Sequence, residues 1–125
     1  MSWFLKHRTM INRAALILRY KEPAVRWINE ADPSPGESPV SVADANQERT
    51  VYLVSEGDVA TGKEMRRWVR ANYQNLWETE LEGWYTDDAL WPKNRTLKEF
   101  DRWFEVECHS VLIDTVGGPL IDDDG

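Results

Sequence analysis

The 125-residue sequence predicts a single two-layer domain, of the α+β or α/β class, in which a three-stranded sheet carries helices on one face. Residues 13–20 and 50–55 have the alternating apolar pattern of strands, and residues 61–83 repeat apolar side chains at helical spacing. With two shorter helical segments and a last strand-like segment, the expected order is strand, helix, strand, long helix, short helix, strand. Because three strands cannot support two layers of helices, we expect the helices on one side of the sheet.

The first strand and the first helix lie in the N-terminal third of the chain. Residues 13–20, RAALILRY, predict a central strand with Leu16 and Leu18 on one face and Ile17 on the other. Pro23 suits the first turn of a following helix. That helix, PAVRWINEA, would place four apolar residues on one side, namely Ala24, Val25, Ile28 and Ala31. The next strand then suggests a βαβ-like unit, with a right-handed crossover if the two strands are parallel.

Two segments are expected to be mobile. Residues 32–49 hold three prolines and show no periodic apolar pattern, which predicts a long irregular connection. Residues 117–125 form a flexible tail that ends in acidic residues. Within the single domain, residues 1–125, the folded unit is therefore expected to span about residues 10–116.

The longest predicted element is a helix over residues 61–83. Thr61 and Glu64 have the spacing of a capping box, and Gly83 is placed to end the helix. A helix of roughly 20 residues is about 30 Å long, which is enough to span the domain. The apolar residues that recur at steps of three and four are Met65, Trp68, Val69, Tyr73, Leu76, Trp77 and Leu81.

The C-terminal part combines a short helix with a third strand. Thr96 and Glu99 repeat the capping-box pattern at the start of that helix. Its inward-facing residues are expected to be Leu97, Phe100, Trp103 and Phe104. Residues 105–115, EVECHSVLIDT, fit either a strand or a continuation of the helix, and their alternating, β-branched content favours the strand.

Charge and hydropathy exclude some classes of protein. Residues 1–30 carry six bases and two acids, and residues 31–125 carry nine bases and twenty acids, for a total net charge of −7. An acidic body lacks the basic face that binding a phosphate backbone requires, so no nucleic-acid partner is predicted. The apolar run near the N-terminus is too short for a signal-peptide core or a membrane span, which predicts a cytoplasmic protein without a membrane partner.

The few residues that suggest chemistry surround the single cysteine, Cys108. Cys108 and His109 are neighbours on the predicted strand, so their side chains point to opposite faces and cannot share a proton. Cys108 is in phase with Val106 and is expected in the core. Glu105, Glu107 and His109 lie on the other face, with about 7 Å between successive side chains. Glu107 and His109 are weak metal candidates because the rest of a ligand set is missing. The alternative is a solvated face, or a histidine paired with a carboxylate.

No enzyme motif is present in the sequence. It contains no glycine-rich phosphate loop, nucleophile elbow or P-loop, so we assign no catalytic residue and no cofactor. The acidic pairs Glu80/Glu82 and Asp87/Asp88 could act as general acids or bases. Two adjacent carboxylates more often begin a helix, where acids suit the helix dipole.

The stretch EGWYTDDALWPKNRT, residues 82–96, is the best candidate for an interaction site. We expect Leu90 and Trp91 to fold back onto the long helix and become mostly buried, because a buried tryptophan contributes about 4 kcal/mol. The polar rim would then stay accessible beside partly exposed aromatic rings. The candidate interaction residues are Trp84, Tyr85, Asp87, Asp88 and Arg95.

The stretches NRAALILRYKEPAVRWI, TVYLV and LWPKNRTLKEFDRWFEVECHS together resemble a group of short bacterial proteins with no assigned activity. The resemblance covers about residues 10–115 without the 32–49 connection, and it implies no activity, cofactor or partner. The positions that carry it are Trp91, Pro92, Arg95, Thr96, Phe100, Trp103, Phe104, Glu107 and His109.

Three functions agree with these observations. The first is a non-catalytic protein-interaction module or small homodimer, since seven tryptophans exceed what a core of this size commonly needs. The second is an acidic inhibitor or immunity-type protein for a basic enzyme such as a nuclease, because charge complementarity accelerates such association. The third is a metal-assisted hydrolase that uses Glu107, His109 and nearby aspartates.

Overall fold

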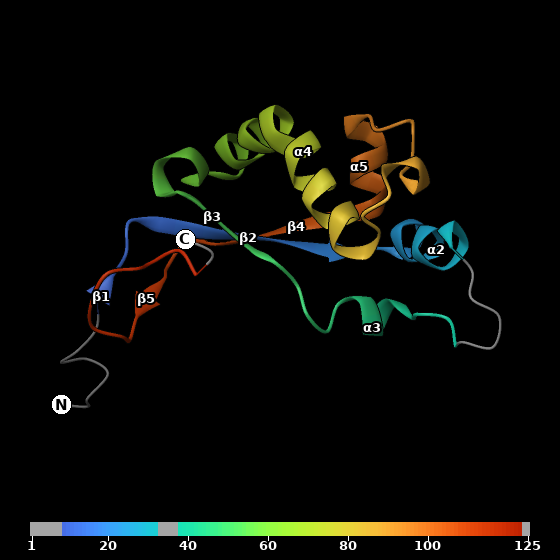
Figure 1. The fold of residues 1–125 in the computed structure, drawn as a ribbon. Coiled ribbons are helices and arrows are strands. Elements are labelled where there is room, and N and C mark those ends of the chain that lie inside the picture. The colour runs from blue at the N-terminus through green and yellow to red at the C-terminus, as the bar shows by residue number, and fades with distance from the viewer. Residues whose placement is uncertain (1–8, 33–37, 124–125) are drawn as a thin grey trace.

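Three antiparallel strands form the central sheet in the computed structural model, which describes residues 9–32 and 38–123 (Figure 1). The strands are β2 (Arg13–Tyr20), β3 (Val51–Ser55) and β4 (Phe104–His109), and β2 lies between the other two. The predicted bounds of β2 and its central position are confirmed. The three-stranded sheet with its helices makes this an α+β domain.

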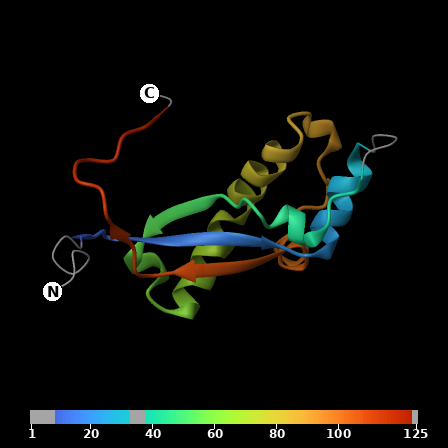
Figure 2. The same ribbon diagram turned by 90° about the horizontal axis from the view of Figure 1, so that it is seen from below.

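The predicted βαβ-like unit is wrong, because β3 runs antiparallel to β2. Helix α2 (Glu22–Ala31) lies beyond the end of β2 instead of crossing back along the sheet (Figures 1 and 2). The chain therefore re-enters the sheet at the end where β2 stopped, and β3 must run in the opposite direction.

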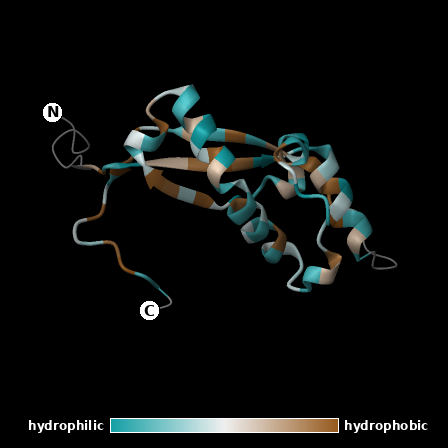
Figure 3. Cartoon of the chain, turned by 90° about the horizontal axis from the view of Figure 1, so that it is seen from above, coloured by the Kyte–Doolittle hydropathy of each residue, from teal (hydrophilic) through white to brown (hydrophobic). Residues whose placement is uncertain are grey.

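The main helices pack on one face of the sheet, as expected. Helix α4 (Gly62–Trp84) crosses that face, and α5 (Leu97–Trp103) lies beside it (Figures 1 and 2). Seen from the helix side, α4 shows mostly hydrophilic residues and the longest hydrophobic segments are on the strands (Figure 3). On the opposite face of the sheet, Val51 and Leu53 of β3 are 53% and 49% exposed.

The core lies between the strands and α4. Leu16 and Leu18 of β2 point toward the helices and are buried, whereas Ile17 on the other face is partly exposed. Trp77 of α4 has no exposed surface, and its ring meets those of Phe100 and Trp103 at centroid distances of 5.7 Å and 5.2 Å. The aromatic residues of α4 and α5 thus share one contact region, as the helical spacing predicted.

The start of α4 agrees with its predicted cap, but its end does not. The Thr61 hydroxyl accepts a hydrogen bond from the Glu64 N–H at 3.1 Å. Gly83 was expected to end the helix, yet the helix continues to Trp84, and the Tyr85 N–H still bonds to the Leu81 carbonyl at 2.9 Å. A glycine stops a helix when it adopts a positive φ, and Gly83 does not.

The connection predicted as irregular contains a short helix, α3 (Val42–Ala45). A reciprocal capping box holds it, in which Ser41 and Asp44 each accept a hydrogen bond of 3.0 Å from the other's N–H. The Asn46 side chain then accepts from the Tyr20 N–H at 2.8 Å and donates to the Tyr20 carbonyl at 3.1 Å. Four helical residues are too few to show a period, so the sequence pattern could not reveal α3. Residues 33–37 of this connection lie outside the described residues.

Residues 105–115 are not a continuation of α5. After β4, a separate strand β5 (Ile113–Asp114) pairs with β1 (Thr9–Met10). This pairing adds Thr9 to the folded unit, which was expected to begin near residue 10. The described part of the tail, residues 117–123, contains neither helix nor strand. Residues 1–8 and 124–125 lie outside the described residues.

Two further single-turn elements complete the fold, the 3₁₀ helices η1 (Glu56–Val59) and η2 (Asp88–Leu90). η1 leads from β3 into α4, and η2 lies in the turn between α4 and α5.

None of the helices formed by the described residues combines the length and the apolar character that crossing a bilayer requires.

Candidate functional site

The C-terminal end of α4 carries a buried carboxylate. Glu80 follows Trp77 by three residues and Leu76 by four, so it belongs to the apolar stripe of the helix, and it is only 8% exposed. Acidic side chains are rarely buried to this extent unless hydrogen bonds or a cation compensate for lost hydration.

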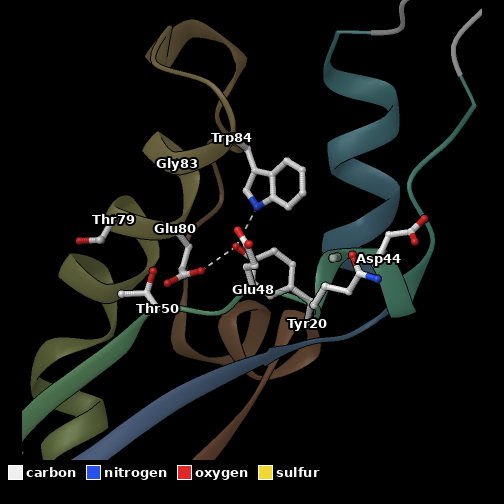
Figure 4. Close-up of a pocket in the computed structure, with 10 residues that line it drawn as sticks. Tyr20, Asp44, Glu48, Thr50, Thr79, Glu80, Gly83 and Trp84 are labelled. Carbon is white, nitrogen blue, oxygen red and sulfur yellow. Dashed lines mark hydrogen bonds between the residues drawn. The ribbon is translucent and has the colours of Figure 1, made fainter.

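Two tyrosine hydroxyls supply hydrogen bonds to Glu80. Tyr20, the last residue of β2, donates to Glu80 Oε1 at 2.7 Å, and Tyr52 of β3 donates to Glu80 Oε2. The Tyr20 oxygen in turn accepts a hydrogen bond from Trp84 Nε1 at 2.9 Å. Because an indole N–H can only donate, the Tyr20 proton must point to Glu80. We call Tyr20, Tyr52, Glu80 and Trp84 the tyrosine–glutamate cluster; Figure 4 labels three of its members.

Both tyrosines remain protonated donors at neutral pH. Burial raises the pKa of Tyr20 well above its usual range, and the negative charge of Glu80 raises it further. The pKa of Tyr52 is also raised, first by burial and then by its hydrogen bond to Glu80. Among the described residues, no salt bridge includes Glu80, so hydroxyl groups rather than a cation compensate for its burial there.

A cavity of about 340 Å³ opens beside this cluster (Figure 4). Glu80 and Trp84 of α4 form one side, Tyr20 lies at its base, and Asp44 and Glu48 come from α3 and the segment after it. Of the ten described residues that line it, three are acidic and none is basic. The last turn of α4 also lacks a basic side chain, and its terminal carbonyls carry a partial negative charge. The electrostatic potential of the cavity therefore favours a cationic group.

On the other side of the same helix end, the turn between α4 and α5 is held to the body by side-chain hydrogen bonds. The Tyr85 hydroxyl donates to the Ile28 carbonyl at 2.5 Å, and its ring stacks edge-on against Trp27 at 5.3 Å. Trp27 Nε1 donates to the Leu90 carbonyl at 2.9 Å, and Trp91 Nε1 donates to the Tyr85 carbonyl at 2.8 Å. We call residues 85–91 the tethered turn.

The predicted rim residues have different environments in the structure. Asp87 and Asp88 are exposed, and Asp87 also caps η2 by accepting a hydrogen bond from the Ala89 N–H at 3.0 Å. Tyr85 is half-buried in the turn, and Trp84 is half-buried in the cavity wall instead. Leu90 and Trp91, expected to be mostly buried, are half-buried.

Arg95 does not belong to an open rim, contrary to expectation. Its guanidinium pairs with Glu78 at 3.1 Å, donates to the Pro92 carbonyl at 3.0 Å, and lies 5.9 Å from the centre of the Trp91 ring. These contacts leave the side chain 25% exposed. Arg95 therefore connects the end of the turn to α4 through its two terminal nitrogens, while its Nε is buried without a hydrogen-bond partner among the described residues.

The weak metal candidates lie on the open face of the sheet. Glu107 receives a hydrogen bond of 3.0 Å from Arg49 and lies 4.0 Å from Arg19, while His109 Nε2 is 3.9 Å from its other oxygen. The two arginines therefore already balance the negative charge of Glu107, which a metal ion would need for binding. In the described part of the chain, no three His, Cys, Asp or Glu residues are grouped closely enough to hold a metal ion.

Cys108 is exposed, so its predicted place in the core is wrong. It has the phase expected, opposite Leu16 of β2, but β4 is an edge strand and leaves this position open.

Comparison of the chain with protein-family profiles, with curated proteins and with solved structures gives no match. The resemblance to short bacterial proteins therefore stays a prediction from the residues that carry it.

Sequence reasoning treated Glu80 as one of several acidic residues and missed the cluster. The signal was its position, because a carboxylate within the apolar stripe of α4 has to be buried with its neighbours. Nothing local indicated its partners, since Tyr20 and Tyr52 precede it by 60 and 28 residues.

Proposed function

We propose that this protein is a non-catalytic interaction module that binds a basic partner protein at the acidic end of α4. The observation that carries the proposal is the tethered turn, which projects Asp87 and Asp88 into solvent from a backbone held by side-chain hydrogen bonds. Groups placed in this way lose little conformational entropy when they bind.

The charge of the whole chain supports a basic partner over an acidic one. With a net charge of −7, the protein attracts cationic surfaces at long range, which raises the rate of association. An inhibitor that covers a basic enzyme would be one form of this function. A hydrolytic role for Glu107 and His109 gains no support, because Arg49 and Arg19 already occupy the carboxylate.

The test is binding of a fluorescently labelled polylysine peptide, followed by anisotropy at low and at physiological salt. We expect Asp88→Lys to weaken binding roughly tenfold, because it reverses a charge at the contact. Glu56→Lys is the matched control, since Glu56 is an exposed acid in η1, which packs near the N-terminal end of α4. It makes the same change in net charge and should alter affinity by no more than about twofold.

Equal losses in the two variants would refute the proposal, since they would indicate attraction by net charge without a defined contact. Thermal midpoints of both variants should stay close to that of the parent protein, because neither side chain is buried. A large drop for Asp88→Lys alone would assign Asp88 a structural role in η2.

A further inference from the structure

The cavity beside Glu80 is lined by acidic side chains, and no described residue in its wall is a cation that would balance them. Glu80 accepts hydrogen bonds from the hydroxyls of Tyr20 and Tyr52. The Tyr20 oxygen accepts a hydrogen bond from the Trp84 N–H, so the Tyr20 proton points to Glu80. These contacts supply donors to its oxygens but no positive charge. Because neutral hydroxyls provide hydrogen bonds but no opposite charge, the carboxylate of Glu80 still favours a cationic ligand in this cavity.

Other groups in the cavity wall add to this potential. Glu48 is exposed and lines the opening, and Asp44 lies near it with its carboxylate engaged in the α3 cap. The carbonyl end of α4 also forms part of the wall, and no base in its last turn offsets the partial negative charge. The negative charge of the cavity wall therefore comes from three parts of the chain, namely α3, the segment after it and α4.

Aromatic rings define the kind of cation that fits. Tyr20 and Trp84 both line the cavity, with ring centroids 6.2 Å apart, and Figure 4 shows the indole turned toward the Tyr20 hydroxyl. Aromatic faces attract organic cations and also contact their methylene groups. A small hydrated metal ion would gain nothing from these rings.

We infer that this cavity binds an alkylammonium group, whose charge lies near Glu80 and Glu48 and whose methylene groups contact Trp84. The cavity volume of about 340 Å³ is at the small end of the range typical of ligand sites and accommodates a short aliphatic amine. Such a group occurs in free alkylamines and in lysine side chains. This inference does not rest on the proposed function, because the tethered turn and the cavity use different residues.

The probe that tests it is n-butylammonium chloride, added to isotope-labelled protein and followed by proton–nitrogen NMR. Each of the seven tryptophans contributes one indole N–H, and Trp84→Phe identifies the signal that belongs to Trp84. We expect a saturable shift of the Trp84 indole signal and of the Thr79 and Gly83 amides, which line the cavity. Sodium chloride at equal concentration controls for ionic strength. The neutral isostere n-butanol should leave these signals nearly unchanged.

Two variants test the site, and neither replaces a residue of the tyrosine–glutamate cluster. Glu48→Gln removes one exposed charge and should weaken binding about fivefold, which corresponds to about 1 kcal/mol. Gly83→Leu adds a large side chain at a residue that lines the cavity and is designed to obstruct it, and a Cβ at this position has no atom within 4 Å, so the fold has room for the substitution. Binding to Gly83→Leu should be lost. Glu82→Gln is the matched control, because Glu82 is an exposed acid on the same helix outside the cavity wall.

The source of the ammonium group is decided by a second titration, with Nα-acetyl-lysine N-methylamide. Tighter binding of this compound than of n-butylammonium supports a lysine side chain of a polypeptide, and weaker binding supports a free alkylamine. Asp88→Lys should leave both affinities within about twofold, which separates this site from the tethered turn. The inference is overturned if n-butanol causes the same shifts, or if Glu48→Gln and Gly83→Leu bind the probe as the parent protein does.

Discussion

The hydroxyl of Tyr20 holds two neighbours of the cluster together, and replacing Tyr20 with phenylalanine tests its contribution to stability. The hydroxyl is 2.7 Å from Glu80 Oε1 and 2.9 Å from Trp84 Nε1, and the residue is only 5% exposed. Without it, a buried carboxylate oxygen loses its donor and an indole N–H loses its acceptor. A hydrogen bond to a charged group contributes about 1.5–3 kcal/mol, and a neutral one about 1 kcal/mol. We therefore expect Tyr20→Phe to lower the free energy of unfolding by about 3 kcal/mol.

Tyr52→Phe provides the internal comparison. It removes a single hydrogen bond to the same carboxylate, and Tyr52 is half-buried, so water can reach the vacated oxygen more easily. The expected loss is about 1.5 kcal/mol. Glu80→Gln keeps the shape of the side chain but removes its charge. In that background Tyr20→Phe should be less damaging by about 1 kcal/mol, because the two residues interact directly.

Urea unfolding followed by tryptophan fluorescence measures these differences, with the slope of the transition checked for constancy. The reasoning would be refuted if Tyr52→Phe destabilised the protein as much as Tyr20→Phe. It would also be refuted if the effects of Tyr20→Phe and Glu80→Gln were additive, since additivity means that the hydroxyl and the carboxylate do not interact.

Three further predictions concern pH, the core and α3. Because the pKa values of Tyr20 and Tyr52 are both raised in the folded protein, the unfolded chain releases protons above pH of about 10 that the folded chain keeps. Stability should therefore be complete below that pH and fall above it, with each tyrosine contributing up to about 1.4 kcal/mol per pH unit. Urea unfolding across this range should show a flatter decline in Tyr20→Phe, in which Tyr52 alone of the two keeps its proton. Trp77→Ala should reduce stability by about 4 kcal/mol, because Trp77 is fully buried, whereas Arg67→Ala should cost less than about 0.5 kcal/mol, because Arg67 is exposed. Similar shifts in denaturant midpoint for the two variants would contradict the helical phase. Asn46→Ala removes the two hydrogen bonds to the Tyr20 backbone, so it should lower the free energy of unfolding by about 2 kcal/mol and increase hydrogen exchange of residues 41–46. Unchanged exchange would show that the capping box alone holds α3.

Elements whose stability depends on neighbouring residues could be predicted from the sequence. The apolar run of residues 13–20 indicated β2 with the bounds that the structure has, and Leu16 and Leu18 face the core as expected. Thr61 and Thr96 cap α4 and α5 as their capping patterns predicted, since a cap involves residues only three positions apart.

The direction of β3, the end of α4 and the role of Arg95 required the tertiary structure. The direction of β3 depends on the position of α2 beyond the end of β2, and no local sequence pattern indicates that position. A glycine such as Gly83 can end a helix, but α4 continues by one residue to Trp84, whose indole N–H donates a hydrogen bond to Tyr20. Arg95 looked accessible because its ion-pair partner, Glu78, is 17 residues away.

The sequence by itself determined the main strands and helices, β2, β3, α2, α4 and α5, and the acidic character of this protein, because period, capping and net charge are properties of neighbouring residues or of the composition. Only the tertiary structure decided that Glu80 would be buried against two tyrosines and beside a cavity. Its hydrogen bonds join residues 60 and 28 positions apart in the chain, and each becomes favourable only after α4 packs on the sheet and excludes water.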